Sequence, residues 1–210
     1  MKLTIFGATG RTGQLLVKQA LEAGHELTVY VRNPDAFNFQ NHHLKIVQGD
    51  LHDKLKLKDA ISGADACISV LGGNSLTKHA TTICEGIENI VGIMQLQGVD
   101  RFIYLSSLGA GESRNLMSPV ARLLIVHFLL RVPLSDHTRN QNTITQSRLN
   151  WTILQPGGLT DKAMTGVYRS GSEPVRVKGS PGISRSNVAH FILTEVEQNN
   201  FTGKEVWLYE

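Results

Sequence analysis

The sequence has few cysteines, and this shortage excludes two kinds of protein. Only two of the 210 residues are cysteine, Cys67 and Cys84, and they form no Cys-x-x-Cys pair. A disulfide framework needs more cysteines than this, and a zinc site needs clustered ligands. The adjacent His42 and His43 would point apart on a strand, and they lack carboxylate or cysteine partners at ligand spacing. We therefore expect two buried, unpaired cysteines and no metal site.

An excess of charge of one sign is also lacking. The chain has 21 lysines and arginines against 18 acidic residues, so its formal net charge is +3. The basic residues are scattered, whereas a nucleic-acid-binding protein usually has a dense Lys/Arg patch. The charge therefore favours an anionic small molecule as ligand, and we expect no nucleic-acid partner.

The sequence lacks an apolar run long enough to span a bilayer, which takes about 20 residues. Residues 120–132 are strongly apolar, but Arg122, His127 and Arg131 interrupt them. This stretch predicts a short helix that covers a pocket or forms a subunit contact, with a buried core helix as the alternative. No signal-peptide pattern precedes the first glycine loop. We expect a cytoplasmic monomer or homodimer without a membrane partner.

Short strand-like runs alternate with helical stretches, which is typical of a parallel sheet with crossover helices. We expect strands at residues 3–6, 26–31, 44–47, 66–71, 102–105, 151–154 and 205–209, and a strand or hairpin at 174–178. We expect helices at residues 12–23, 54–61, 79–97, 136–147 and 187–197. No repeat or linker interrupts the pattern. The sequence therefore predicts one Rossmann-like α/β domain over residues 1–210, with a doubly wound, mostly parallel sheet and a substrate cleft formed by the C-terminal third.

A glycine-rich loop lies directly between the first strand and the first helix, with the sequence Gly7-Ala8-Thr9-Gly10-Arg11-Thr12-Gly13. Gly7 would permit a tight turn, Gly10 would let the backbone approach a pyrophosphate, and Gly13 would let the helix pack closely on the strand. The free N–H groups and the positive end of the helix dipole would then face the phosphates. The loop predicts a dinucleotide site.

The end of the second strand predicts which dinucleotide binds. An NAD site has an Asp or Glu there to bind the ribose 2′-hydroxyl, whereas this strand ends with Arg32-Asn33. Arg32 could bind a 2′-phosphate bidentately, and Arg11 could add a second positive charge. Asp35 lies slightly beyond the strand end. We therefore predict NADPH as cofactor and expect NADH to be disfavoured, with a surface role for Arg32 as the alternative.

Further strand ends complete the predicted groove, because ligands bind at the carboxyl ends of strands in open α/β sheets. Asp50 could bind the adenine amine, and Leu51 would lie beside it. The Leu71-Gly72-Gly73 turn would let the cofactor pass close to the backbone. Ser106 and Ser107 would lie near the nicotinamide ribose.

Several segments together resemble the atypical short-chain dehydrogenase/reductase superfamily. They are GATGRTGQLLVKQALEAGHELTVYVRNP, GVDRFIYLSSLGAG, SRLNWTILQPGG and ISRSNVAHFIL. Within that superfamily the chain is most similar to the NAD(P)H-binding group that includes biliverdin reductase B, the NADPH-dependent flavin reductase. The resemblance implies a Rossmann domain that transfers hydride from NADPH to a flavin, a linear tetrapyrrole or a quinone-like acceptor.

The resemblance also implies roles for residues near the acceptor. Ser107 would lie beside the nicotinamide, His137 would line the substrate cleft, and Gln155-Pro156-Gly157 would pass the carboxamide. Two positions depart from the family pattern, because Gln155 replaces an arginine and Asn187 replaces an acidic residue. The predicted cofactor-binding residues are Gly7, Thr9, Gly10, Arg11, Thr12, Gly13, Arg32, Asp50, Leu51, Leu71, Gly72, Gly73, Ser106, Ser107, Gln155, Pro156 and Gly157.

The usual catalytic pair of short-chain dehydrogenases is missing. That pair is a Tyr with a Lys four residues later, and none of Tyr30, Tyr104, Tyr168 and Tyr209 has such a Lys. A nucleophile elbow and a P-loop lysine are absent as well. Ser107 and His137 are the predicted catalytic residues, with His137 as general acid because histidine titrates near neutral pH.

Two functions remain open on this sequence. The first is an NADPH-dependent reductase of a flavin, quinone or similar planar acceptor, for which the protein mainly positions the two reactants. The second is a non-catalytic NADP(H) sensor that acts on a protein partner, resembling the nitrogen-metabolite-repression regulators. The missing Tyr–Lys pair fits both functions.

Overall fold

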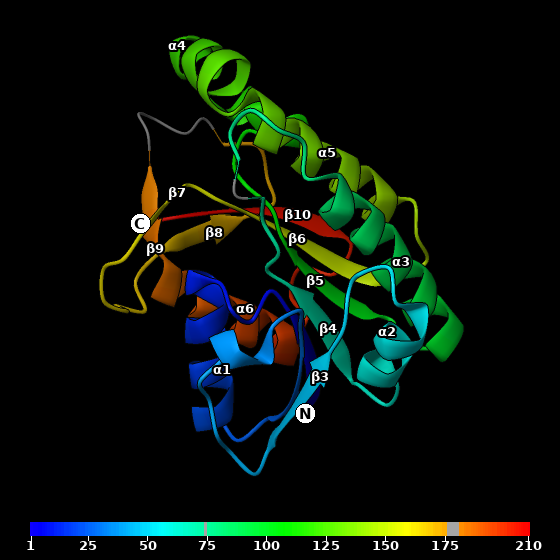
Figure 1. Ribbon diagram of the computed structural model, residues 1–210. Helices are drawn as coiled ribbons and strands as arrows, with labels where there is room; N and C mark the ends of the chain where they lie inside the picture. Colours follow the sequence, from blue (N-terminus) through cyan, green and yellow to red (C-terminus); the bar gives the residue numbers. More distant parts are fainter. Residues whose placement is uncertain (74, 176–180) are drawn as a thin grey trace.

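The computed structural model describes residues 1–73, 75–175 and 181–210, and it shows one α/β domain (Figure 1). Its main sheet has eight strands in the order β3-β2-β1-β4-β5-β6-β10-β8. All neighbours in this sheet are parallel except β8, which is antiparallel to β10. The predicted Rossmann-like fold with a doubly wound, mostly parallel sheet is confirmed.

The strands and helices follow one another along the chain as the alternating pattern predicts. The strands are β1 Lys2–Phe6, β2 Glu26–Val31, β3 Leu44–Gln48, β4 Ala66–Ser69, β5 Arg101–Leu105, β6 Asn150–Pro156, β7 Gly158–Thr160, β8 Arg169–Gly171, β9 Gly182–Ser184 and β10 Lys204–Tyr209. The helices are α1 Arg11–Glu22, α2 Lys54–Ile61, α3 Thr81–Gln97, α4 Pro119–Ala121, α5 Arg131–Thr145 and α6 Arg185–Gln198, with the 3₁₀ turns η1 Pro34–Ala36 and η2 Gly111–Leu116 and the π-helix η3 Arg122–Leu129.

The sheet lies between two layers of helices, and alternate strand residues face each layer. Ile103 and Leu105 of β5 pack in the core beneath α1 and α6, whereas Phe102 and Tyr104 pack in the core beneath α2, α3 and α5. This alternation follows from the two-residue period of a strand. Cys67 and Cys84 are buried and unpaired, as the sequence predicts.

The apolar stretch at residues 120–132 is not one helix. It consists of α4 and η3, and α5 then begins at Arg131, five residues before the predicted start. Pro133 explains the break, because it has no N–H to continue the η3 ladder but is tolerated in the first turn of a new helix. Val120, Leu123, Leu124 and Leu129 are all more than half exposed, so the buried-core alternative is wrong at these positions.

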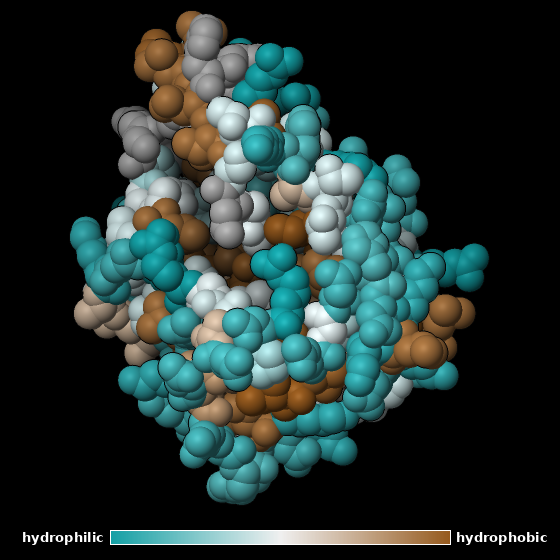
Figure 2. Space-filling view, viewed as in Figure 1, coloured by the Kyte–Doolittle hydropathy of each residue, from teal (hydrophilic) through white to brown (hydrophobic). Residues whose placement is uncertain are grey.

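These exposed apolar side chains lie at one end of the molecule. Figure 1 shows α4 projecting beyond the sheet, and Figure 2 shows apolar residues gathered at the same end. Within the described residues, no helix is both long and apolar enough to cross a membrane.

Three parts of the chain differ from the predicted secondary structure. Strand β8 at Arg169–Gly171 is absent from the prediction, and there Gly171 packs against Trp207 of β10. Of the strand or hairpin expected at 174–178, residues 174 and 175 are not in a strand, and residues 176–178 lie outside the described residues. The small parallel sheet of β7 and β9 is absent from the prediction because each strand has only three residues. Helix α3 begins at Thr81 and not at His79: Ala80 is its N-cap with a non-helical ψ of 56°, and the N–H of Ala80 donates to Asp136.

Candidate functional site

The glycine loop forms a tight turn between β1 and α1. Gly7 has φ +88°, and a Cβ there would lie 2.9 Å from the carbonyl carbon of Val70. A Cβ on Gly13 would lie 2.1 Å from the carbonyl oxygen of Gly7, so Gly13 lets α1 pack directly on the loop. Gly10 caps α1 without a side-chain hydrogen bond, and the first turn of the helix has no acidic residue. The helix N-terminus can therefore accept an anion.

A cavity of about 770 Å³ opens at this loop. Its walls come from the carboxyl ends of β1, β2, β3 and β4 and from the segment that leads into α3. The strand order reverses between β1 and β4, which is where ligands bind in doubly wound sheets. The volume falls within the usual range for small-molecule sites, about 300–1,000 Å³. The predicted residues that line the cavity are Gly7, Thr9, Gly10, Arg11, Arg32, Leu51, Leu71, Gly72 and Gly73.

The cavity has a positive lining. Arg11, Arg32 and Lys78 face it, and none of the described residues that line it is an Asp or a Glu. Arg11 Nη1 lies 3.0 Å from Asp161 Oδ2, and Arg185 Nη1 lies 2.6 Å from the other oxygen of that carboxylate. Within the described part of the chain, Arg32 and Lys78 have no ion pair. Their charges are available to an anionic ligand.

Some predicted cofactor residues lie outside this cavity. Thr12 is buried, and Gly13 packs against the backbone of Gly7 and Ala8 in the loop. Asp50 is exposed, its carboxylate accepts the N–H of His52, and its carbonyl accepts the hydroxyl of Tyr30. Asp50 is thus not among the residues that line the cavity, and its contact with an adenine amine stays a prediction.

The predicted residues of β5 and β6 lie at the neighbouring strand ends. Ser106 is buried and accepts from Gln141 Nε2 at 2.7 Å, whereas Ser107 is half-buried. The amide of Gln155 is buried and donates to Glu205 Oε2 at 2.7 Å. Pro156 accepts the N–H of Leu108, and Gly157 packs against the backbone of Pro181. These contacts connect the ends of the strands. Ser107 is more exposed than Ser106.

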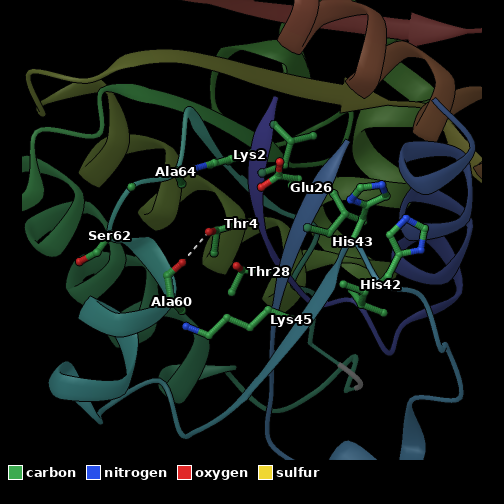
Figure 3. A pocket seen from close by; sticks show the side chains of 14 residues that line it. Lys2, Thr4, Glu26, Thr28, His42, His43, Lys45, Ala60, Ser62 and Ala64 are labelled. Atoms are coloured by element: carbon green, nitrogen blue, oxygen red, sulfur yellow. Dashed lines mark hydrogen bonds between the residues drawn. The ribbon is translucent and has the colours of Figure 1, made fainter. Parts of the chain in front are cut away.

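A second, smaller cavity of about 310 Å³ lies at the opposite edge of the sheet, among the amino ends of β1, β2 and β3 (Figure 3). His42 and His43 line it with ring centroids 3.9 Å apart. The expectation that these rings point apart is wrong, because they lie in a turn before β3. Within the described residues, no group of three His, Cys, Asp or Glu side chains could hold a metal ion. This cavity is remote from the glycine loop and is not the cofactor site.

His137 lies on α5 and forms a hydrogen-bonded network with β5. Its Nδ1 is 2.8 Å from the hydroxyl of the fully buried Tyr104, and Asn140 Nδ2 donates to the same hydroxyl at 2.9 Å. Burial lowers the pKa of His137 to about 4, against a smaller opposite effect of Asp136. The imidazole is therefore neutral at pH 7, so a role as general acid from a protonated resting state, which the sequence predicts, is not supported.

Lys78, His79 and Tyr30 are among the lining residues that sequence reasoning missed. Lys78 and His79 lie in the connection between β4 and α3, where no motif draws attention to them. Tyr30 lies two residues before Arg32, and its hydroxyl donates to the Asp50 carbonyl at 2.7 Å. A Cβ on Gly49 would lie 2.1 Å from that hydroxyl, so glycine leaves room for the Tyr30 side chain. The Gly49-Asp50 dipeptide is therefore the sequence feature that could have indicated this contact.

The fold and the phosphate-binding loop define a nucleotide-binding protein of the Rossmann class. A family model described as NAD(P)H-binding matches residues 7–199. The chain therefore belongs to the NAD(P)H-binding family, which confirms the resemblance noted in the sequence.

Relatives and solved structures cover the whole chain. The chain is 28% identical over 217 residues to the UPF0659 protein YMR090W of Saccharomyces cerevisiae, across 98% of this chain and 91% of that protein. ChuY, described as an anaerobillin reductase from Escherichia coli O157:H7, superposes with a TM-score of 0.82 at 23% identity, covering 100% of this chain and 97% of ChuY. A short-chain dehydrogenase/reductase from Veillonella parvula in complex with NADP has a TM-score of 0.81 at 18% identity, covering 100% and 94%. At these identities the two structures establish the fold.

Proposed function

We propose that the protein is an NADPH-dependent oxidoreductase that transfers hydride to a flavin, a quinone or a similar planar conjugated acceptor. The observation that carries the proposal is the charge of the 770 Å³ cavity, where Arg32 and Lys78 lie beside the glycine loop and none of the lining residues that the structure describes is acidic. A carboxylate at the end of β2 would repel a 2′-phosphate, whereas a guanidinium can bind one.

The residues around the cavity fit the parts of NADPH. The backbone N–H groups at the start of α1 would bind the diphosphate, and Arg32 and Lys78 would bind the 2′-phosphate. Leu51, Leu71 and Ile83 offer apolar surface to ring systems. When bound, the nicotinamide supplies the hydride, and the protein supplies binding, orientation and exclusion of water.

The tyrosines favour a conjugated acceptor over a simple carbonyl. Reduction of a carbonyl by short-chain dehydrogenases requires a tyrosine that donates a proton, and burial raises the pKa of Tyr104 far above its ordinary value. Burial, with Asp53 and Asp50, raises the pKa of Tyr30 to about 12. Tyr168 is bonded to His190 at 2.7 Å. An acceptor that takes hydride into a conjugated ring can obtain its proton from water. The reductase name of ChuY is consistent with this class.

A second function, an NADP(H) sensor that acts on a protein partner, is favoured by one observation. Leu123, Leu124 and Leu129 are more than half exposed at the projecting end of the molecule. To separate the two functions, pure protein is mixed with NADPH and with FMN, a quinone or a dye, and the absorbance of the reduced cofactor is followed. Turnover supports the reductase, whereas tight binding without turnover of any acceptor contradicts it and supports the sensor.

Calorimetry on an Arg32→Ala variant tests the cofactor assignment. Loss of a charge-assisted contact costs about 1.5–3 kcal/mol, so the affinity for NADPH should fall roughly 10- to 150-fold. The affinity for NADH should change little, because NADH has no 2′-phosphate. Arg148→Ala is the matched control, since Arg148 is exposed and does not line the cavity. Equal weakening of NADPH and NADH would refute the role of Arg32.

A further inference from the structure

The segment between β4 and α3 forms one wall of the cofactor cavity. Lys78, His79 and Ala80, at the end of this segment, all line the cavity. The bonds of Ser75 within the segment are local, because its hydroxyl accepts the N–H groups of Thr77 and Lys78. Local bonds of this kind shape a turn, but they do not fix its place against the rest of the molecule.

Asp136 on α5 connects this segment to another element. Its Oδ2 accepts the N–H of Ala80 at 2.7 Å, and its Oδ1 lies 2.5 Å from Nδ1 of His79. A backbone N–H can only donate and a carboxylate oxygen accepts, so the bond to Ala80 does not depend on the orientation of a ring or an amide. Figure 1 shows α3 and α5 side by side on one face of the sheet. Asp136 therefore anchors the cavity wall to the neighbouring helix.

The carboxylate of Asp136 lies behind the wall and not in the cavity. Its side chain is 14% exposed, and Asp136 is not among the residues that line the cavity. Ala80 is the N-cap of α3, and the first turn of this helix has no acidic residue of its own. The carboxylate from α5 thus meets the positive end of the α3 dipole. It holds the wall without placing an acidic group among the described residues that line the cavity.

We infer that Asp136 is a positioning residue that fixes the segment carrying Lys78 against the cavity and thereby sets the preference for NADPH over NADH. The preference rests on the proposed function, in which Lys78 binds the 2′-phosphate, whereas the anchoring of Ala80 does not. The lysine ammonium is on a long flexible side chain. If its backbone were loose as well, part of the binding free energy would be spent on ordering the segment, and the affinity would fall.

The sign of the effect separates positioning from simple charge. Asp136 is a negative charge near a site for an anion, so loss of the charge alone would strengthen the binding of NADPH. Loss of the anchor would weaken it. In calorimetry, Asp136→Ala should weaken NADPH roughly 10-fold and change NADH by less than about twofold. Asp136→Asn keeps an oxygen that can accept the N–H of Ala80, so its affinity for NADPH should lie between those of the wild type and Asp136→Ala.

Two further variants sharpen this experiment. Glu88→Gln is the matched control, because Glu88 on α3 accepts from Arg139 of α5 at 2.8 Å but does not line the cofactor cavity; it should leave both affinities unchanged. In a Lys78→Ala background, neither Asp136 variant should weaken NADPH further, because the two residues act as a unit. Asp136→Asn carries the same comparisons if Asp136→Ala does not fold. Tighter binding of NADPH in the Asp136 variants, or an equal loss with and without Lys78, would overturn the inference.

Amide hydrogen exchange of the full chain, followed by NMR, tests the anchor without any nucleotide. The N–H of Ala80 should exchange slowly in the wild type and in Glu88→Gln, and much faster in Asp136→Ala. Fast exchange of this N–H in the wild type would refute the anchor. If the wild type binds neither nucleotide while Ala80 is protected, the proposed function fails together with the NADPH preference, and the anchor stands.

Discussion

The ion pair beneath α6 makes a strong prediction about stability. The carboxylate of Glu195 is 1% exposed, and the side chain of Arg101 that it meets at 2.7 Å is 9% exposed. Glu195 Oε1 also accepts from the hydroxyl of Thr152 and from the N–H of Phe201, each at 3.0 Å. Glu195→Ala would leave the guanidinium of Arg101 buried without its counter-charge.

The size of this effect follows from the burial of the pair. Removing one partner of a buried ion pair costs about 3–5 kcal/mol. For a chain of this length, each kcal/mol lowers Tm by about 2–4 °C, so the expected decrease is roughly 6–20 °C. Urea unfolding followed by circular dichroism measures the free energy of unfolding, and a thermal melt measures the decrease in Tm.

Two variants control this experiment. Glu197→Ala removes a carboxylate from the same helix that is 48% exposed and lies 3.1 Å from His25, and it should cost less than about 1 kcal/mol. The double variant Arg101→Met, Glu195→Leu should recover most of the loss, because apolar residues of similar volume often replace a buried pair without penalty. If Glu195→Ala were no less stable than Glu197→Ala, or if the double variant lost the sum of both single effects, the reasoning would be refuted.

Three further predictions concern the cofactor site and its surroundings. Gly13→Ala should abolish detectable NADPH binding in calorimetry, because its Cβ would lie 2.1 Å from the carbonyl of Gly7; unchanged affinity would show that the loop can shift. Asp161→Asn should tighten NADPH binding up to about fivefold at low salt, because it frees Arg11, and no gain at low salt would contradict this. His137 has a folded-state pKa of about 4, below its ordinary value, so the unfolded chain binds a proton that the folded chain excludes as pH falls from 6.5 to 4. The free energy of unfolding should therefore be retained above pH 6.5 and decrease below it by up to roughly 3 kcal/mol. Urea titrations should show this decrease in the wild type but not in His137→Gln.

The sheet and the phosphate loop could be predicted because both depend on local sequence. The apolar strands alternate with amphipathic helices, and the Gly7–Gly13 loop lies directly between a strand and a helix, so period and position are enough to identify them. The boundaries of α1, β2 and α2 differ from the prediction by no more than one residue at either end. Where a prediction failed at Arg131, a proline in the first turn explains the new helix start; before Thr81, the backbone of Ala80 is non-helical and its N–H donates to Asp136 on a distant helix.

The sequence alone determined the Rossmann-like fold, the dinucleotide loop and the guanidinium at the end of β2, because each is set by residues close together in the chain. Only the tertiary structure decided which side chains meet the ligand cavity and in what state. Lys78 joins Arg32 there, Arg11 is paired with Asp161, and His137 is neutral beneath Tyr104. The physical reason is that burial and pairing depend on partners from other elements, such as Asp161, which is 150 residues from Arg11.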